Sequence, residues 1–318
     1  MLRKLAIIGT GNIGAVLIEE AARRHLAKVI AAVDVKEPDV AKGKALDCAE
    51  GLPIVKSDVE IIGSRDFSVI AGADIVVNTA GVPRSKRPDG TIPSREELLA
   101  TNLKITDGVA AAVKQNCPEA IVINVANPLD AIVYRLYQKL GAPKNRILGM
   151  AGQLDSARYR YFVAQAAKVS VDNVEAMVLG GHGDDMVPIR SACRIAGLPV
   201  TQFINEDTLA AIEKRTRGAG AEVVGLLGSG SAFVSPAWAA LDMVEAIAYD
   251  RRKIIASCVL LEGEFGVNGL FVGVPAILGK NGVEKVIEFP LNDAEKAAFA
   301  KSMAAVQKTV NEVKAMSA

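Results

Sequence analysis

The sequence is poor in the residues that cross-link proteins or bind metals, with four cysteines and two histidines among 318 residues. No C-x-x-C pair occurs, and no cysteine lies close to a histidine in the chain. This argues against a disulfide framework and against a metal site. We expect reduced thiols, mostly packed as small apolar groups, in a cytoplasmic protein without bound metal. The four cysteines are Cys48, Cys117, Cys193 and Cys258.

The sequence also lacks a large net charge and a long hydrophobic run. Its 37 basic residues balance 36 acidic ones, so neither a nucleic-acid-binding surface nor a charged disordered tail is indicated. The first apolar segment, Leu5–Gly9, is too short for a signal peptide or a membrane span. Half of the residues are hydrophobic, which is enough for a full core. The expected partner is therefore a small molecule or another subunit.

The first half of the chain alternates short, uninterrupted apolar runs with longer mixed segments. Uninterrupted runs favour strands buried on both faces, and their alternation with helices predicts an open, doubly wound parallel sheet of the Rossmann kind. The predicted strands are 4–8, 28–34, 59–62, 74–79, 120–125 and 146–148. The predicted helices between them are 13–25, 41–50, 95–116 and 129–140.

The pattern changes near Gly149. Helices are predicted at 153–168, 207–227 and 236–249, with a strand at 174–179 and an antiparallel pair at 252–260 and 269–278. Asn292 and Glu295 resemble a capping box, and the helix after them carries an apolar stripe. We therefore divide the chain into a dinucleotide-binding domain, 1–149, and a mixed α+β substrate domain, 150–318.

The segment Gly9-Thr10-Gly11-Asn12-Ile13-Gly14 has the pattern G-x-G-x-x-G directly after a predicted strand. Such glycines let the backbone approach a pyrophosphate at a helix N-terminus. Asp34 ends the second predicted strand, 20 residues after Gly14, and can accept hydrogen bonds from ribose hydroxyls. Its carboxylate would repel the extra phosphate of NADP, so NAD is the predicted cofactor.

The candidates for chemistry lie in the second half. His182 stands in a Gly-Gly-His-Gly-Asp segment just past a predicted strand, where functional residues of such folds collect. His25, at the end of the first helix, is better explained as a solvated or capping histidine. Asp155 and Arg158 are three residues apart and share a helix face, a spacing that also suits an ordinary helical ion pair.

Seven motifs in this order resemble the NAD-dependent L-lactate/malate dehydrogenase family, and most closely the lactate-dehydrogenase-like malate dehydrogenases of bacteria. The resemblance covers nearly the whole chain. The motifs are GTGNIG (9–14), TAGVPR (79–84), SREELLATN (94–102), VANPLD (125–130), LDSAR (154–158), GGHGDDMVP (180–188) and GSAFVSPA (230–237).

The resemblance implies a role for each candidate. His182 would exchange a proton with the substrate hydroxyl, and Asp155 would hold the other ring N–H. Arg158 would bind the C1 carboxylate with its guanidinium fork. Arg95 would polarise the C2 carbonyl. In the same way, Asn127 would bind the substrate near the nicotinamide.

The remaining expected cofactor contacts also come from the resemblance. Asn102 and the turn from Val125 to Asn127 would contact NAD, and the Asn127–Pro128 bond would be cis. Family members form dimers or tetramers, so we expect a homodimer or a homotetramer.

The loop between the second and third motifs is expected to select the substrate. In the family, the arginine after G-V-P pairs with the second carboxylate of malate, and that position is Arg84. Arg95 follows 11 positions later, and relatives commonly have a shorter segment there. Because residues within 85–94 are extra, Lys86 or Arg87 stays open as the true contact.

Three other functions share parts of this sequence pattern. A lactate or other 2-hydroxy-acid dehydrogenase would use the same residues. An NAD-using glycosidase needs a metal held by Cys and His, which this sequence does not place together. A non-catalytic NAD sensor would have no reason to keep His182, Asp155, Arg158 and Arg95 together. A malate dehydrogenase is therefore the preferred hypothesis.

We predict that Arg84→Gln lowers activity on oxaloacetate by several orders of magnitude and leaves NADH binding intact, because the second carboxylate loses its partner. Steady-state rates and NADH titrations measure the two effects, with Arg87→Gln as the matched control. If Arg84→Gln stays active and Arg87→Gln does not, the assignment of Arg84 is wrong.

Overall fold

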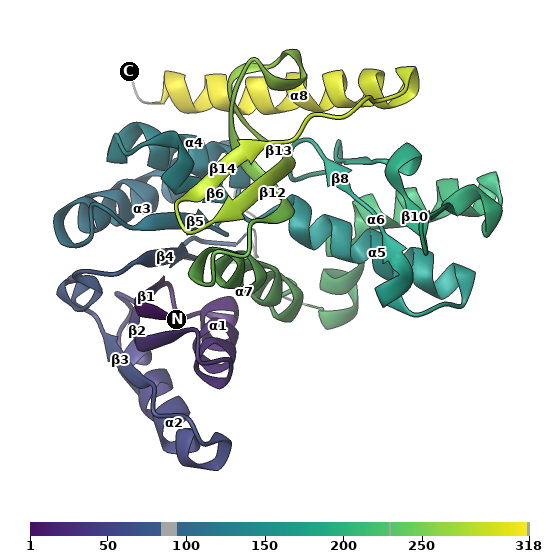
Figure 1. Ribbon diagram of the computed structural model, residues 1–318. Coiled ribbons are helices and arrows are strands. Elements are labelled where there is room, and N and C mark those ends of the chain that lie inside the picture. Colours follow the sequence, from purple (N-terminus) through teal and green to yellow (C-terminus); the bar gives the residue numbers. More distant parts are fainter. Residues whose placement is uncertain (84–93, 229, 317–318) are drawn as a thin grey trace.

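The computed structural model describes residues 1–83, 94–228 and 230–316 (Figure 1). Its centre is a nine-stranded sheet with the strand order β14-β13-β12-β6-β5-β4-β1-β2-β3. The strands of this sheet are β1 Leu2–Ile8, β2 Ala27–Val33, β3 Glu60–Ser64, β4 Ile75–Asn78, β5 Ile121–Asn124, β6 Ile147–Gly149, β12 Lys253–Glu262, β13 Asn268–Gly279 and β14 Gly282–Val286.

Strands β1 to β6 run parallel, as the sequence predicts. Alternate residues of β1 enter two different core clusters. Leu5 packs in one cluster with residues of α1 and α7, and Ala6 packs in the other with residues of α3 and α4. The sheet is thus buried on both faces, which explains the uninterrupted apolar runs and confirms the doubly wound α/β class.

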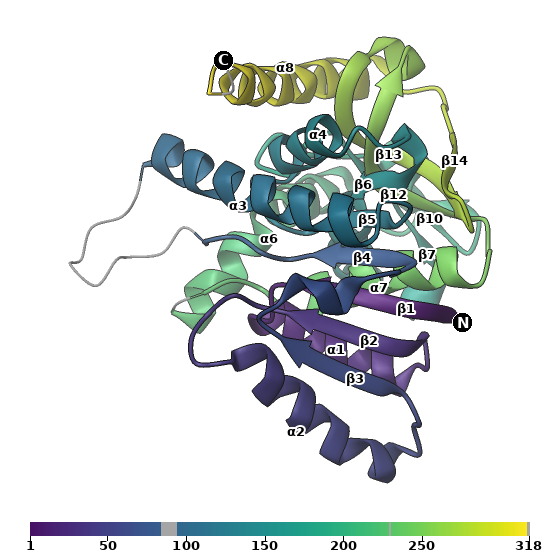
Figure 2. The same cartoon turned by 90° about the vertical axis from the view of Figure 1, so that its left-hand side faces the viewer.

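The helices cover both faces of the sheet. Helices α3 and α4 have the predicted bounds, whereas α2 continues five residues beyond its predicted end. Figure 2 shows α3 and α4 side by side and α2 beside β3. The helices are α1 Asn12–Arg23, α2 Val40–Val55, α3 Arg95–Asn116, α4 Leu129–Leu140, α5 Gly152–Ala167, α6 Glu206–Leu227, α7 Val234–Ala248 and α8 Asp293–Ala315.

Strands β12 and β13 form the predicted antiparallel pair. The sequence pattern of these two segments did not indicate that they extend the sheet formed by β1 to β6. Cys258 of β12 lies antiparallel to Gly149 of β6, and β14 adds the last strand. The second half of the chain is therefore joined to the first through backbone pairing as well as side-chain packing.

The prediction of one strand at 174–179 is wrong. The structure has two short strands there, β7 (Val174–Glu175) and β8 (Val178–Leu179). They belong to different sheets, since β7 pairs with β10 (Arg194–Ile195) and β8 with β9 (Val187–Pro188). Strand β10 also pairs with β11 (Leu198–Pro199). An apolar run cannot reveal a change of pairing partner within it.

Helix α8 lies across the top of the molecule in Figure 1 and contacts α4, β9 and β13. It begins at the predicted capping box, in which Asn292 accepts from the Glu295 N–H and the Glu295 carboxylate accepts from the Asn292 N–H. Its apolar stripe is buried, as predicted: Phe299, Met303, Val306, Val310 and Val313. No helix among the described residues is long and apolar enough to cross a membrane.

We predict that Phe271→Ala destabilises the protein by about 3–5 kcal/mol. Phe271 of β13 is fully buried, and its ring meets the Tyr137 ring edge-on at 5.4 Å between centroids. Ile254→Ala on β12 is the matched control, because Ile254 is 52% exposed, and it should cost less than about 1 kcal/mol. Urea unfolding at equal protein concentration compares the two. Equal costs would contradict this placement of the core.

Candidate active site

The glycine-rich turn follows β1 and opens α1, as the sequence predicts. Gly9 has a φ of +89°, and a Cβ there would lie 2.8 Å from the Ala80 nitrogen. A Cβ on Gly14 would lie 2.0 Å from the Gly9 oxygen. These two glycines are required by close backbone packing and, at Gly9, by the backbone conformation.

Gly11 differs from its two neighbours. A Cβ at Gly11 would meet nothing within 4 Å, so the protein itself does not require a glycine at this position. No side chain caps this end of α1, which contains Asn12 and Ile13, and the first N–H groups of a helix have no partner within the helix. An open surface with free backbone donors suits an anionic pyrophosphate.

Asp34 directly follows β2 and reaches back to this turn. Its Oδ2 accepts hydrogen bonds from the Thr10 N–H at 2.8 Å and the Thr10 hydroxyl at 3.2 Å. Its Oδ1 accepts one further bond, from the Lys36 N–H at 3.2 Å. A carboxylate has about four lone-pair directions and these bonds use three, so Asp34 keeps acceptor capacity for one ribose hydroxyl.

Asn102 and Asn127 are linked. Asn102 is 2% exposed, and its side-chain amide donates to the backbone oxygens of Asn127 at 2.8 Å and Val82 at 3.1 Å. Its Oδ1 accepts from the Val82 N–H at 2.8 Å. Asn102 thus holds two backbone segments at the carboxyl end of the sheet, and its side chain is bonded to protein. The Asn127–Pro128 peptide is cis, as the resemblance implied.

His182, Asp155 and Arg158 come together although 27 positions separate His182 from Asp155. Nδ1 of His182 lies 2.8 Å from Oδ2 of Asp155, and Nη1 of Arg158 lies 3.3 Å from Oδ1 of the same carboxylate. The Asp155 side chain is only 2% exposed. An ionised carboxylate accepts only, so Nδ1 carries a proton and Nε2 is the nitrogen left for a ligand.

Burial lowers the pKa of His182, because it disfavours the charged ring. The charge of Asp155 and its hydrogen bond oppose this effect, and the charge of Asp130 adds to them. Arg158 acts in the other direction, and the pKa of His182 is raised in total. The protonated ring therefore persists to higher pH than in a free histidine.

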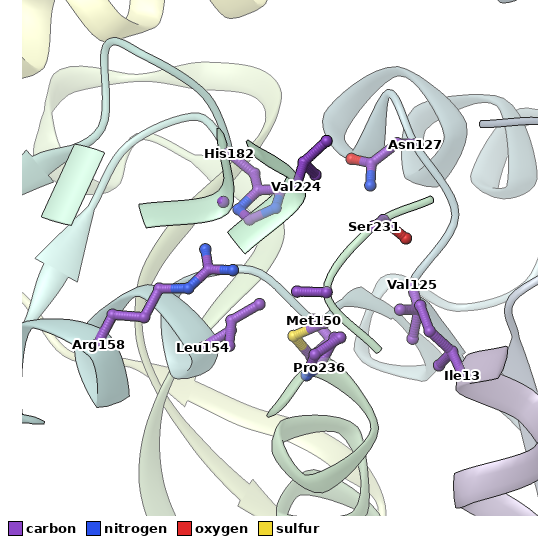
Figure 3. A pocket seen from close by; sticks show the side chains of 12 residues that line it. Ile13, Val125, Asn127, Met150, Leu154, Arg158, His182, Val224, Ser231 and Pro236 are labelled. Carbon is purple, nitrogen blue, oxygen red and sulfur yellow. The ribbon is translucent and has the colours of Figure 1, made fainter. Parts of the chain in front are cut away.

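A pocket of about 210 Å³ lies where the two halves of the chain meet (Figure 3). The side chains of Arg158 and His182 reach into it from one side, while Ile13, Val125 and Asn127 lie on the other. Its remaining lining residues are Met150, Leu154, Gly220, Val224, Ser231, Ala232 and Pro236. The pocket thus combines a guanidinium, an imidazole and an amide with mostly apolar walls, which suits a small anionic molecule.

Some predicted residues are not part of this pocket. Arg95 is the first residue of α3; it is exposed and does not line the pocket. Arg84, Lys86 and Arg87 lie outside the described residues. His25 is exposed, with Nδ1 3.4 Å from the Ser57 hydroxyl, in keeping with its expected minor role.

Two residues near His182 received no role from the sequence. Asp130 accepts a hydrogen bond from the His182 N–H at 3.1 Å, and the Ser302 hydroxyl accepts one from the Gly181 N–H at 2.9 Å. The motif that ends in Asp130 could have drawn attention to it. Nothing in the sequence pattern of α8 marks Ser302.

The turn after β1, with Asp34 beside it, fits a dinucleotide, and the His–Asp–Arg cluster fits a proton exchange beside an anion. These features define an NAD-dependent dehydrogenase. The chain belongs to the lactate/malate dehydrogenase family: the NAD binding domain of that family matches residues 3–149, and its alpha/beta C-terminal domain matches residues 152–317. NAD is its cofactor.

Individual relatives agree with this family. "Malate dehydrogenase 1" of Anaeromyxobacter dehalogenans is 48% identical over 98% of both chains. The crystal structure of malate dehydrogenase from Cryptosporidium parvum has a TM-score of 0.93 and 38% identity, covering 99% of this chain and 100% of that one. The lactate dehydrogenase from the same organism, solved with lactic acid and its cofactor, also reaches 0.93, with 36% identity over 99% and 98%. The fold alone therefore does not distinguish a malate dehydrogenase from a lactate dehydrogenase.

We predict that Gly11→Ala weakens NADH binding at least tenfold and leaves stability within about 0.5 kcal/mol, because the methyl group would meet only the ligand. Gly14→Ala is the control, since its methyl group would collide with the Gly9 oxygen and destabilise the fold. NADH fluorescence titration and thermal melts measure the two effects. Unchanged NADH affinity in Gly11→Ala would contradict this placement of the pyrophosphate.

Proposed function

We propose that the chain is an NAD-dependent malate dehydrogenase, which interconverts (S)-malate and oxaloacetate. One observation carries the type of reaction: His182, paired with Asp155 at 2.8 Å, shares a pocket with Arg158. Malate is favoured over lactate by the curated relatives, which are named malate dehydrogenases at 45–48% identity, and by the arginine after G-V-P. The natural alternative is an L-lactate or other 2-hydroxy-acid dehydrogenase.

When bound, NAD would supply a nicotinamide ring as the acceptor of the hydride from C2 of malate and as its donor in the reverse direction. The work of the protein is to bind the substrate and to move one proton. Nε2 of His182 accepts the proton of the C2 hydroxyl as the hydride leaves, and gives it back to oxaloacetate. Asp155 keeps Nδ1 protonated and stabilises the imidazolium that forms.

Arginines hold and polarise the substrate. The Arg158 fork binds the C1 carboxylate, and Asn127 donates to the substrate oxygen from the other side of the pocket. Arg95 stabilises the negative charge that develops on the C2 oxygen. Because Arg95 is exposed and outside the pocket, this role requires a movement of the first turn of α3 towards the substrate. Arg84 pairs with the second carboxylate.

The dinucleotide is held by the first half of the chain. The segment from Gly9 to Gly14 receives the pyrophosphate, and Asp34 accepts from the adenosine ribose. Val125 and Asn127 line the pocket and would contact the nicotinamide there. Asn102 acts on NAD through the backbone of Asn127, which it holds.

Further features of this proposal concern the whole molecule. Residues 1–149 form the NAD-binding domain and 150–318 the substrate domain, which is supported by the separate core cluster around Tyr159 and Phe162. The protein is a cytoplasmic homodimer or homotetramer, in line with free thiols and with exposed apolar side chains such as Trp238 and Leu226. Its reaction is a step of the tricarboxylic acid cycle.

We predict that oxaloacetate with NADH is turned over at least a hundredfold more efficiently, by kcat/KM, than pyruvate. A monocarboxylate would leave the guanidinium that we assign to the second carboxylate without its partner. Initial rates of NADH oxidation at several concentrations of each 2-oxo acid provide the comparison, with 2-oxobutanoate as a control for size without a second charge. Faster turnover of pyruvate than of oxaloacetate would identify lactate, and not malate, as the substrate. No turnover of any 2-oxo acid would contradict the enzyme class.

A further inference from the structure

The loop that carries His182 is attached to three separate elements through three consecutive backbone N–H groups. Gly180 donates to the Gly273 oxygen of β13 at 2.8 Å, and Gly181 donates to the Ser302 hydroxyl of α8 at 2.9 Å. His182 itself donates to Oδ2 of Asp130, in the first turn of α4, at 3.1 Å. Only the attachment to Asp130 places a formal charge beside His182.

In the hydrogen bonds that the described residues make with the Asp130 side chain, its two oxygens are the acceptors. Oδ2 accepts from the His182 N–H, and Oδ1 accepts from the Cys258 thiol at 3.3 Å. The ionised carboxylate satisfies both donors. The N-terminal end of α4, where Asp130 is the second residue, also favours an anion.

Burial raises the pKa of Asp130, and the charge of His182 together with the thiol and backbone donors counteracts part of that rise. Burial also raises the pKa of the Cys258 thiol well above its usual range, so this group stays a neutral donor. The support for a negative charge on Asp130 is geometric, because one donor faces each of its two oxygens.

Among the residues that the structure describes, the charged groups that act on His182 come from two helices. Asp155 and Arg158 belong to α5, and Asp130 belongs to α4. The groups from α8 and β13 that hold the loop are the Ser302 hydroxyl and the Gly273 carbonyl, which are neutral. The positive charge of Arg158 opposes the effect of one carboxylate on the His182 ring. The negative charge of the second carboxylate then favours the protonated ring.

We propose that Asp130 is a positioning residue for the reaction: it holds the His182 backbone and, as a second carboxylate besides Asp155, favours the imidazolium. This inference rests on the proposed function for its catalytic meaning. The effect on the ring itself does not depend on which substrate the enzyme uses, so the two can be tested separately.

The decisive variant is Asp130→Asn. The amide has nearly the same shape, and its oxygen can still accept from the His182 N–H, so the change removes the charge and keeps the attachment. Ser302→Ala is the matched control, because it removes an attachment of the neighbouring residue without changing any charge. A purely structural role of the loop would leave Asp130→Asn without effect on His182 and would place any effect in Ser302→Ala.

The chain has only two histidines, so a ring titration by NMR is simple to interpret. Protein labelled with ¹³C in the imidazole ring is titrated without ligand, and His25→Asn assigns the two signals. We expect the pKa of His182 to fall by about half a unit to one unit in Asp130→Asn and to stay unchanged in Ser302→Ala. His25 serves as the internal reference and should not shift in either variant.

The same variants are then compared in oxaloacetate reduction, which requires the protonated ring. A lower pKa moves the loss of kcat/KM at high pH to lower pH, so the profile of Asp130→Asn should shift down by the same amount as the NMR titration. An unchanged His182 titration in Asp130→Asn overturns this inference, whatever the activity is. If Asp130→Asn does not fold, Asp130→Ser removes the same charge with a smaller side chain and should give the same shift.

The two proposals fail in different ways. Wild-type protein that turns over no 2-oxo acid would refute the proposed function, and the NMR comparison would still decide the role of Asp130 towards the ring. Wild-type protein that is active, together with variants that leave the His182 titration and the pH profile unchanged, would refute the role of Asp130 alone.

Discussion

The hydrogen bond between His182 and Asp155 is the interaction on which the site depends. The pairing of strands in the large sheet brings these two residues together. Asp155 lies on α5, which directly follows β6, whereas His182 follows β8. The loop of His182 is bonded to Gly273 of β13, and β13 pairs with β12, which pairs with β6. Backbone pairing across the sheet therefore fixes the separation of a ring and a carboxylate that are distant in the sequence.

The cofactor side of the pocket is built by a different rule. Strands β1, β2, β4 and β5 are parallel, so their carboxyl ends lie along one edge of the sheet, and each is followed by a segment of the site. Gly9 follows β1, Asp34 follows β2, and Val125 follows β5. Asn102 links the segments after β4 and β5 through hydrogen bonds to Val82 and Asn127. Local strand order thus gathers the residues that we propose bind the dinucleotide, whereas the pair that we propose exchanges the proton needs the second half of the chain.

This difference explains what the sequence could predict. The turn at Gly9–Gly14 and the bounds of α3 and α4 follow from local patterns, and the structure contains them. The break within 174–179 and the pairing of Cys258 with Gly149 depend on which distant strand is available, and local patterns do not contain that information. Asp130 was missed for the same reason, because its partners are the His182 backbone and the Cys258 thiol. The bond from His182 to Asp155 became an expectation only through family resemblance.

The central claim is that Nε2 of His182 exchanges a proton with the substrate oxygen while Asp155 holds Nδ1. Proton uptake on binding tests it most directly. Calorimetry of the NADH complex with a non-reacting dicarboxylate analogue of oxaloacetate, in buffers of different ionisation enthalpy, counts the protons taken up per site. Uptake is expected to rise towards one proton as the pH passes the raised pKa of His182, and His182→Asn should abolish it. Equal uptake in His182→Asn and wild type would show that His182 is not the group that takes up the proton.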